Sequence, residues 1–537
     1  MRQNSNMTTN YANVRQNLSP QKRASIPPPP QTTAPNPPEE SPYSMTEQLL
    51  RERLQRPVYG HLPRQIYAGF LGTKETASNL FKKKPLACLA SLSFGTALGW
   101  TNSVSQHGYQ VKTDQSTSSE VSWLISIMLL GCSLGVTSSS LLMRQMGPKK
   151  VLQAVGPFYI FNWWITLVPQ VNVQMAGRFF LGFLGMSYSN AGENLLIQTI
   201  DFGLRRYITV LYNSMMIMGV FISRVIAAAT TTFWLTVICA SFPILHYALI
   251  QVVPESPVFL YAGGHELAAK SLAWYRGEGN FYMDMANIKK DWDASRQDSD
   301  AYQYMLFSRV VYRPLLVVMC VVFFQICAGY LIFMFYTLEA LTDGKVVFSP
   351  FADSCIFAIY FVFTKMLWGY LHTRFSWKVR GFLISSCLFT SASLGLFSLY
   401  LLLNQYNIDL MINTEWNLLV IAFFFLFSYD MGLNHFSKIL IFEYMPFQMY
   451  KNTYLVIQAE YWLLSFVNIY TFATTFERFH SYTYFAVLSC LTFLGSLFCY
   501  FFVVETKGKS LIQLQLQFGG NPIGTRGALY HQIRQTL

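Results

Sequence analysis

Residues 314–336 read PLLVVMCVVFFQICAGYLIFMFY, an apolar run without a charged side chain. A helix needs about 20 such residues to span the hydrocarbon core of a bilayer. The chain holds eleven more predominantly apolar runs, and a polar stretch divides the twelve into six and six. In order, the twelve runs cover residues 86–106, 121–143, 151–169, 176–199, 207–228, 231–252, 313–337, 351–372, 381–403, 416–443, 453–474 and 482–504. This arrangement predicts an all-α membrane protein with twelve transmembrane helices in two six-helix bundles.

The composition agrees with a lipid environment. Of the 537 residues, 52% are hydrophobic and 12% are charged, whereas a soluble domain carries about 25% charged residues. The basic residues behind the net charge of +12 lie scattered between the apolar runs. We therefore expect contact with a lipid bilayer and no binding of nucleic acid.

The sequence shows none of the side-chain patterns typical of metal sites or catalysis. Its nine cysteines lie inside apolar runs, without metal-binding or disulfide-framework spacing. No nucleophile–base pair or phosphate-binding loop is visible either. We therefore expect no metal, no cofactor and no enzymatic activity.

Lysine and arginine are unevenly distributed between the two sets of short loops. The richer set comprises Arg144, Lys149, Lys150, Arg205, Arg206, Arg374, Lys378, Arg380 and Lys451. The opposite set comprises Lys112, Arg178, Lys345 and Arg478. Because cytoplasmic loops are enriched in lysine and arginine, we expect the richer set and both termini to be cytoplasmic.

The polarity profile divides the chain into five parts. These are a disordered Pro-rich cytoplasmic tail (1–85), an N-terminal six-helix bundle (86–252), a cytoplasmic linker with short helices (253–312), a C-terminal six-helix bundle (313–504) and a cytoplasmic C-terminal tail (505–537). Within the linker, residues 265–276 carry apolar side chains at helical spacing. The tail has no predicted partner.

Short motifs at the ends of the predicted helices resemble those of one family. They are Gly177-Arg178-Phe179, Pro254-Glu255-Ser256-Pro257, Leu272-Ala273-Trp274-Tyr275-Arg276-Gly277, Glu443-Tyr444-Met445-Pro446 and Glu505-Thr506-Lys507-Gly508-Lys509-Ser510-Leu511. Together, over about residues 86–515, they resemble the sugar porter family of the major facilitator superfamily, and especially its insect-type facilitated trehalose transporters. The resemblance implies a major facilitator fold and transport by alternating access.

The charged motifs lie at helix ends, where ion pairs between the bundles can favour one state of a rocking carrier. The residues expected to act in this conformational gating are Arg178, Arg205, Glu255, Arg374, Glu443 and Glu505. Charges that only set the topology of the chain would explain much of the same pattern.

The substrate pocket departs from the family pattern. Alignment on Gly219 places Arg224 where the family has a glutamine, and Lys438 stands where it has a stacking tryptophan. Gln325 keeps one of three amides in the seventh helix, and Tyr461-Trp462 replaces an asparagine–tryptophan pair. The pocket has therefore exchanged several amides for charges and rings.

Six charged residues fall inside the predicted spans, namely Glu193, Arg224, Lys365, Asp430, Lys438 and Glu460. Each costs about 2.5–3.5 kcal/mol at a helix centre, so all should face the protein interior or water. One interpretation is internal pairing, for which the depth along the helices allows Lys438–Glu460 and Arg224–Asp430. The other is that Arg224, Lys365 and Lys438 bind a substrate anion.

The predicted substrate-binding set joins these charges to nearby amides, hydroxyls and rings. It comprises Asn213, Arg224, Gln325, Tyr336, Lys365, Asp430, Asn434, His435, Lys438 and Trp462. A sugar hydroxyl stripped of water needs both a donor and an acceptor, and this set supplies both.

Three functions remain open from the sequence. The first is a facilitative carrier of a sugar such as trehalose or glucose, in a multi-pass protein of the plasma membrane. Ala97 replaces the aspartate of proton-coupled family members, which argues against proton coupling. The second is a carrier of a small organic anion on the same fold, and the third is a non-transporting, sensor-like relative.

Overall fold

The computed structural model describes residues 85–100, 118–168, 170–200, 205–261, 264–276, 285–286, 288–289, 309–343, 350–375, 378–406, 415–445, 447–478, 481–509 and 511–519. The chain divides into two compact units, Met1–Arg53 and Leu54–Leu537, and all of these residues belong to the second. Apart from residue 85, the predicted Pro-rich tail lies outside the described residues, as does most of the stretch between 277 and 308.

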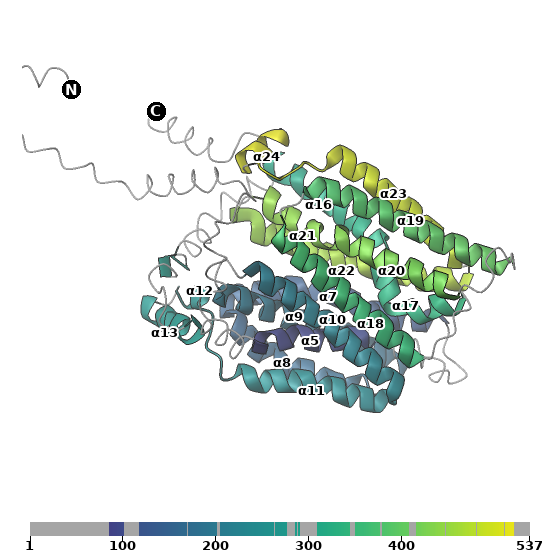
Figure 1. The fold of residues 1–537 in the computed structure, drawn as a ribbon. Helices are drawn as coiled ribbons and strands as arrows, with labels where there is room; N and C mark the ends of the chain where they lie inside the picture. Colours follow the sequence, from purple (N-terminus) through teal and green to yellow (C-terminus); the bar gives the residue numbers. More distant parts are fainter. Residues whose placement is uncertain are drawn as a thin grey trace, which may run out of the picture. The chain divides into compact units, whose positions relative to one another are not determined.

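The part of the second unit that runs up to residue 250, called the first half below, is built from long helices that lie side by side (Figure 1). They are α5 (Pro85–Gly99), α7 (Ser118–Met146), α8 (Pro148–Ile165), α9 (Val171–Thr199), α10 (Arg205–Ala229) and α11 (Thr232–Ile250). Each lies on one predicted run, with bounds that agree to within seven residues, because a continuous apolar stretch in lipid satisfies its backbone only as a helix.

The second half, residues 309–502, follows the same plan with two interruptions. Its helices are α16 (Arg309–Cys327), α17 (Tyr330–Asp343), α18 (Pro350–Arg374), α19 (Val379–Gln405), α20 (Glu415–Met431), α21 (Leu433–Tyr444), α22 (Phe447–Arg478) and α23 (Ser481–Phe502). The pairs α16–α17 and α20–α21 each occupy a single predicted run. The six predicted runs of this half therefore all contain helix.

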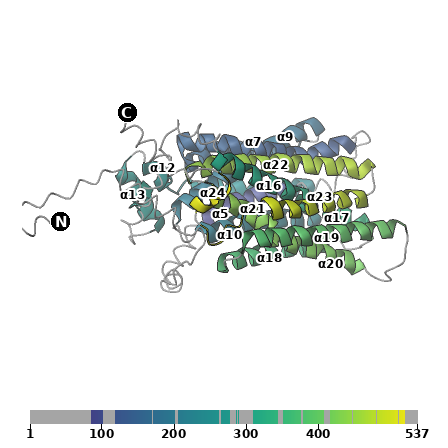
Figure 2. The same ribbon diagram turned by 90° about the horizontal axis from the view of Figure 1, so that it is seen from above.

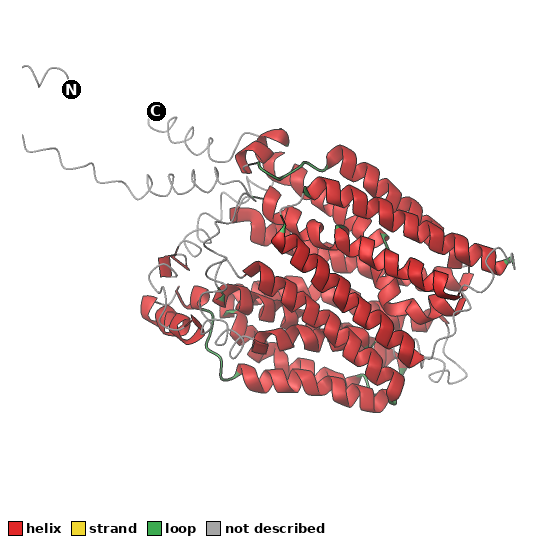
Figure 3. Cartoon of the chain, viewed as in Figure 1, coloured by secondary structure: helices red, strands yellow, loops and turns green. Residues whose placement is uncertain are grey.

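Three short helices lie at one end of the long ones in both views (Figures 1 and 2). They are α12 (Pro257–Leu260), α13 (His265–Arg276) and α24 (Leu511–Gln517). This end is called the α13 end below. The described residues contain helices and loops but no strand (Figure 3).

The outer surface of the helices is apolar, as expected for contact with lipid tails. Eight helices or helix pairs among the described residues are long and apolar enough to cross a membrane. Large apolar side chains point outwards, with Phe501 72% exposed and Phe158 67% exposed. Such exposure is unfavourable in water and favourable in a bilayer.

The two interruptions in the second half occur at glycines, and neighbouring side chains satisfy the backbone groups that the break at Gly432 releases. Gly329, between α16 and α17, has a φ of 76°, which favours glycine. At Gly432, the backbone N–H of Leu433 donates to Ser386 Oγ at 3.1 Å. His372 Nε2 donates to the Met431 carbonyl at 2.8 Å. Broken helices survive at membrane depth only with such compensation.

The two halves meet along two helix pairs, α7 against α22 and α10 against α18. In the first pair, Ser133 Oγ donates to the Ala459 carbonyl at 2.8 Å. The ring of Trp123 lies 4.9 Å from that of Tyr470. At the α13 end, the Arg144 guanidinium donates to Asn452 Oδ1.

Candidate functional site

Glu255, a predicted gating residue, caps the N-terminus of α8. Its Oε1 accepts from the backbone N–H groups of Lys149 and Ser256, both at 2.9 Å, and its Oε2 accepts from that of Lys150 at 3.1 Å. A helix N-terminus presents unpaired N–H groups and a positive dipole end, so a carboxylate is stabilised there. The glutamate thus attaches the segment after α11 to the start of α8.

The linker that follows Glu255 is held by its own hydrogen bonds. Ser271 Oγ donates to the Glu255 carbonyl at 2.5 Å, and the Tyr275 hydroxyl donates to the Pro254 carbonyl at 2.8 Å. Burial, together with the nearby Glu255 charge, raises the pKa of Tyr275, so this hydroxyl keeps its proton and remains a donor. Helix α13 is therefore attached to the first half through the residues that surround the cap.

Glu505 performs the matching task in the second half. Its Oε1 accepts from the backbone N–H of Val379, the first residue of α19, at 3.1 Å. The same oxygen accepts from Thr506 and Lys507, each at 3.1 Å. Glutamates that follow α11 and α23 thus cap the third predicted span of their respective halves.

The remaining gating candidates occupy different surroundings. Arg178 is fully buried inside the first half, where its Nη1 donates to the Ala97 carbonyl at 3.3 Å and its guanidinium lies 5.0 Å from the Trp100 ring centre. Glu443 is 1% exposed at the end of α21. The side chains of Arg205 and Arg374 lie outside the described residues.

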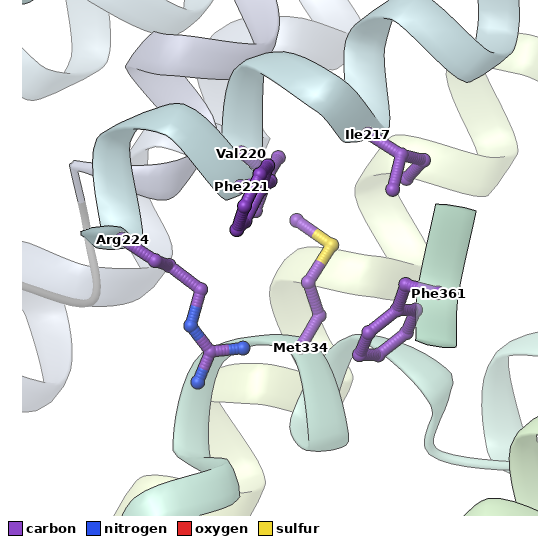
Figure 4. A pocket seen from close by; sticks show the side chains of 6 residues that line it. All are labelled: Ile217, Val220, Phe221, Arg224, Met334 and Phe361. Carbon is purple, nitrogen blue, oxygen red and sulfur yellow. The ribbon is translucent and has the colours of Figure 1, made fainter. Parts of the chain in front are cut away.

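A small cavity opens between the two halves (Figure 4). It measures about 10 Å³, and its lining residues come from α10, α17 and α18. They are Ile217, Val220, Phe221, Arg224, Met334 and Phe361. Ligand pockets usually measure about 300–1,000 Å³, so in the present conformation the cavity is far too small to hold a ligand.

Arg224 is the charged member of this lining, and it is 2% exposed. Figure 4 shows its guanidinium extending from α10 into the space that Met334 also borders. Asn213 lies one turn before Ile217 on the same helix face, where its Nδ2 donates to the Thr209 carbonyl of its own helix at 2.8 Å. Of the predicted substrate-binding set, Arg224 therefore lines the cavity and Asn213 lies one turn beyond it.

Asp430 of α20 and Lys365 of α18 lie inside the second half. Asp430 is fully buried, and its carboxylate accepts from Thr364 Oγ1 at 2.7 Å and from Asn434 Nδ2. Lys365 is a positively charged neighbour of this carboxyl group. The hydrogen-bond partners of Asp430 in the described structure are Thr364 and Asn434, and the predicted Arg224–Asp430 pair stays a prediction.

An aromatic cluster that the sequence analysis did not single out surrounds Asp430 and Lys365. The rings of Tyr330 and Tyr429 stack at 4.5 Å, and Lys365 Nζ lies 5.5 Å from the centre of the Tyr330 ring. The Gln325 amide interacts with the Tyr429 hydroxyl. Tyrosines within an apolar run read as ordinary core residues, so the sequence gives no signal for the cluster.

The other predicted binding residues are spread over the second half. Tyr336 stands at a kink of α17 and contacts Phe472 at 4.8 Å between ring centres. The His435 ring lies 5.1 Å from that of His372. The predicted Lys438–Glu460 pair stays a prediction, because the Lys438 side chain is not among those that the structure describes.

Trp462 is the predicted binding residue that reaches across the interface between the halves. It is 5% exposed, and its ring meets the Phe94 ring of α5 edge-on at 5.8 Å. Its indole Nε1 has no hydrogen-bond partner among the described residues. An indole donor buried in this way is available to a ligand.

Comparison with known proteins gives one family and one fold. Residues 87–518 match the family described as "Sugar (and other) transporter". The chain is 23% identical over 438 residues to the facilitated trehalose transporter Tret1-1 of Drosophila simulans, which covers 80% of this chain and 51% of that protein. It is 24% identical over 439 residues to the facilitated trehalose transporter Tret1 of Polypedilum vanderplanki. This alignment covers 80% of this chain and 86% of that protein. The chain thus spans about half the length of the Drosophila protein.

Two solved structures of the xylose transporter XylE from E. coli show the fold. The inward-open form aligns with a TM-score of 0.66 at 16% identity, over 82% of this chain and 99% of that chain. The form bound to 6-bromo-6-deoxy-D-glucose, described as a major facilitator superfamily proton:xylose symporter, aligns with a TM-score of 0.63 at 18% identity, over 82% of this chain and all of that chain. The predicted major facilitator fold is confirmed.

Proposed function

The chain belongs to the sugar (and other) transporter family, and we propose that it is a facilitative carrier of a sugar such as trehalose or glucose. The observation that carries this proposal is the cavity between α10 of the first half and α17 and α18 of the second. A carrier that works by alternating access needs a binding site between two units that rock against each other. The relatives named as facilitated trehalose transporters support sugar as the substrate.

The proposed moving units are the two predicted six-helix bundles, residues 86–252 and 313–504, joined by the linker 253–312. Glu255 and Glu505 each fix the short segment after their own half to a helix of that half. Their caps stay intact while the halves rotate. The Arg144–Asn452 contact joins the halves at the α13 end and has to break when that end opens.

The surroundings of Arg178 support facilitated rather than proton-coupled transport. Its guanidinium donates to the backbone carbonyl of Ala97, whose methyl side chain cannot bind a proton. A coupling proton needs an ionisable group that gains and loses it during the cycle. Position 97 does not supply one.

The proposed membrane is the plasma membrane, with the α13 end and both termini in the cytoplasm. The loop arginines and lysines support this orientation, because Arg144, Lys149, Lys150, Lys378 and Arg380 all lie at the helix ends near Glu255, Glu505 and Asn452.

The test is uptake by purified protein in liposomes. The liposomes are offered labelled trehalose, labelled glucose, and a set of carboxylates and phosphate esters, with and without a pH gradient. We expect saturable uptake of at least one sugar, at a rate that the pH gradient does not change. Uptake of none of these compounds would indicate a non-transporting relative instead.

A small organic anion is the second candidate substrate, because Arg224 lines the cavity. A guanidinium binds carboxylate or phosphate through two parallel hydrogen bonds. The variant Arg224→Gln separates the two candidates, since it restores an amide and removes the charge. Sugar uptake that is unchanged in Arg224→Gln contradicts the anion carrier.

A further inference from the structure

Helices α19 and α23 of the second half form one continuous apolar wall on the outside of the protein. They pack closely against each other and lie side by side in Figure 1. Ser391 Oγ donates to the Ser489 carbonyl at 2.9 Å, and Ser489 Oγ donates to the Ser391 carbonyl at 2.8 Å. Phe389, Phe493 and Leu497 are among the large apolar side chains that the two helices expose. Such a wall is suited to contact with acyl chains.

Arg380 lies at the α13 end of this wall, where it is fixed against an exposed ring. Its Nη2 donates to the Tyr500 carbonyl, and its guanidinium carbon lies 5.3 Å from the centre of the Tyr500 ring. The Tyr500 side chain is 55% exposed. A cation over an aromatic face is attracted to it, and a guanidinium carries five N–H donors. The group is therefore held in place while most of its donors remain for another acceptor.

Two lysines add positive charge beside Arg380. Glu505 Oε1 accepts from the backbone N–H groups of Val379 and Lys507, each at 3.1 Å, so the start of α19 and the segment after α23 converge there. The side chains of Lys378 and Lys507 are exposed. Within the described parts of the chain, Lys378 and Arg380 form no ion pair. We call Lys378, Arg380 and Lys507 the basic rim.

The corresponding corner of the first half is built differently. The cap at Glu255 places Lys150 in the position that Arg380 occupies in the second half. The residue five positions before Glu255 is Ile250, which is 1% exposed, where the second half has the exposed ring of Tyr500. A basic residue at the end of a spanning helix therefore does not by itself produce the arrangement around Arg380.

We propose that the basic rim binds the phosphate group of an anionic phospholipid, whose acyl chains lie along the wall of α19 and α23. A guanidinium binds phosphate through two parallel hydrogen bonds, and lysines near the membrane surface attract anionic headgroups. Tyr500 stands at the level where aromatic residues meet headgroups. A soluble phosphate ester would contact the cations and leave the apolar wall unused, so a lipid fits the whole surface. This site goes beyond the proposed function and does not depend on the transported substrate.

The test is native mass spectrometry of the purified full-length protein, released from detergent micelles. It is titrated with dioleoyl phosphatidylglycerol, which is anionic, and with dioleoyl phosphatidylcholine, which is zwitterionic. We expect the first phosphatidylglycerol to bind more tightly than the first phosphatidylcholine. Arg380→Gln should raise the Kd for phosphatidylglycerol about fivefold. Tyr500→Leu keeps the wall apolar but removes the ring under the guanidinium, and should raise this Kd about two- to fivefold.

Lys150→Gln is the matched control, because it removes an exposed positive charge at the corresponding cap of the first half. It should change the Kd for phosphatidylglycerol by less than about twofold. The melting temperature of each variant shows that it is folded.

Three results would overturn the lipid site. The first is equal weakening in Arg380→Gln and Lys150→Gln, which indicates diffuse attraction by positive charge. The second is an equal Kd of the wild type for the two lipids. The third is displacement of phosphatidylglycerol by an equimolar amount of glycerol 3-phosphate, which indicates a site for soluble phosphate esters. The assay involves no transport, so a failure of the proposed sugar carrier would leave its outcome unchanged.

Discussion

The same substitution at the two helix caps, Glu255→Gln and Glu505→Gln, should have unequal effects. At Glu505, one oxygen accepts all three N–H bonds, so the single amide oxygen of glutamine can replace it. At Glu255, the three bonds divide over both oxygens. A glutamine there has to turn its NH₂ group towards at least one backbone N–H, that of Lys150.

The difference between the two variants follows from these contacts. Both lose a negative charge at a helix N-terminus, which is worth about 0.3–2 kcal/mol. Glu255→Gln additionally leaves a partly buried N–H facing another donor, which adds about 1–2 kcal/mol. We therefore expect Glu255→Gln to be destabilised more than Glu505→Gln by about 1–2 kcal/mol.

The measurement is the free energy of unfolding by titration with sodium dodecyl sulfate in mixed micelles. Wild type and both variants are compared at one lipid composition, and the proposed uptake of sugar is used to check that each starts from the folded state. The reasoning is refuted if the two variants lose equal free energy of unfolding, or if Glu505→Gln loses more. Either result would mean that the division of the N–H bonds, over one oxygen in Glu505 and over both oxygens in Glu255, does not determine the stability.

Three further changes have defined outcomes. Gly147→Ala should lower the free energy of unfolding by about 1–3 kcal/mol in the same titration. Gly147 has a φ of 86°, and an added Cβ would lie 3.0 Å from the Glu255 carboxylate. An unchanged free energy would contradict this prediction. Ser386→Ala should cost about 1–3 kcal/mol, since the Leu433 N–H at the helix break loses its acceptor. The control Ser385→Ala, whose hydroxyl bonds only within α19 in the described structure, should cost less than about 0.5 kcal/mol. Arg144→Ala removes the contact with Asn452 and should raise the labelling rate of cysteines introduced at the α13 end, while an unchanged rate means that the contact does not hold that end closed.

The sequence was sufficient for the spans and for the helix-end glutamates. A run of about 20 apolar residues has one stable form in lipid, so each of the twelve predicted runs contains helix. Glu255 and Glu505 were placed at helix ends, although the backbone N–H groups that they cap became visible only with the fold. Those groups lie more than a hundred positions away in the chain.

The interior of the second half was less predictable. Depth along a helix can be counted from the sequence, but the direction in which a side chain points also depends on how helices are rotated and where they break. Gly432 interrupts the helix between Asp430 and Asn434, and Asp430 is hydrogen-bonded to Thr364 of α18. Tyr330 was missed because a tyrosine in an apolar run looks like core.

The cap at Glu255 also bears on the order of events during synthesis. Lys149, at the start of α8, and Glu255 are separated by 106 positions. Translation proceeds at about 5–20 residues per second, so α8 waits about 5–20 s for its cap. A nascent chain that stops after the last spanning helix of the first half, at residue 252, has not yet made this glutamate. The first half is therefore complete only once the polar segment behind it has left the ribosome, and ribosome pausing within that segment would expose an unfinished helix end.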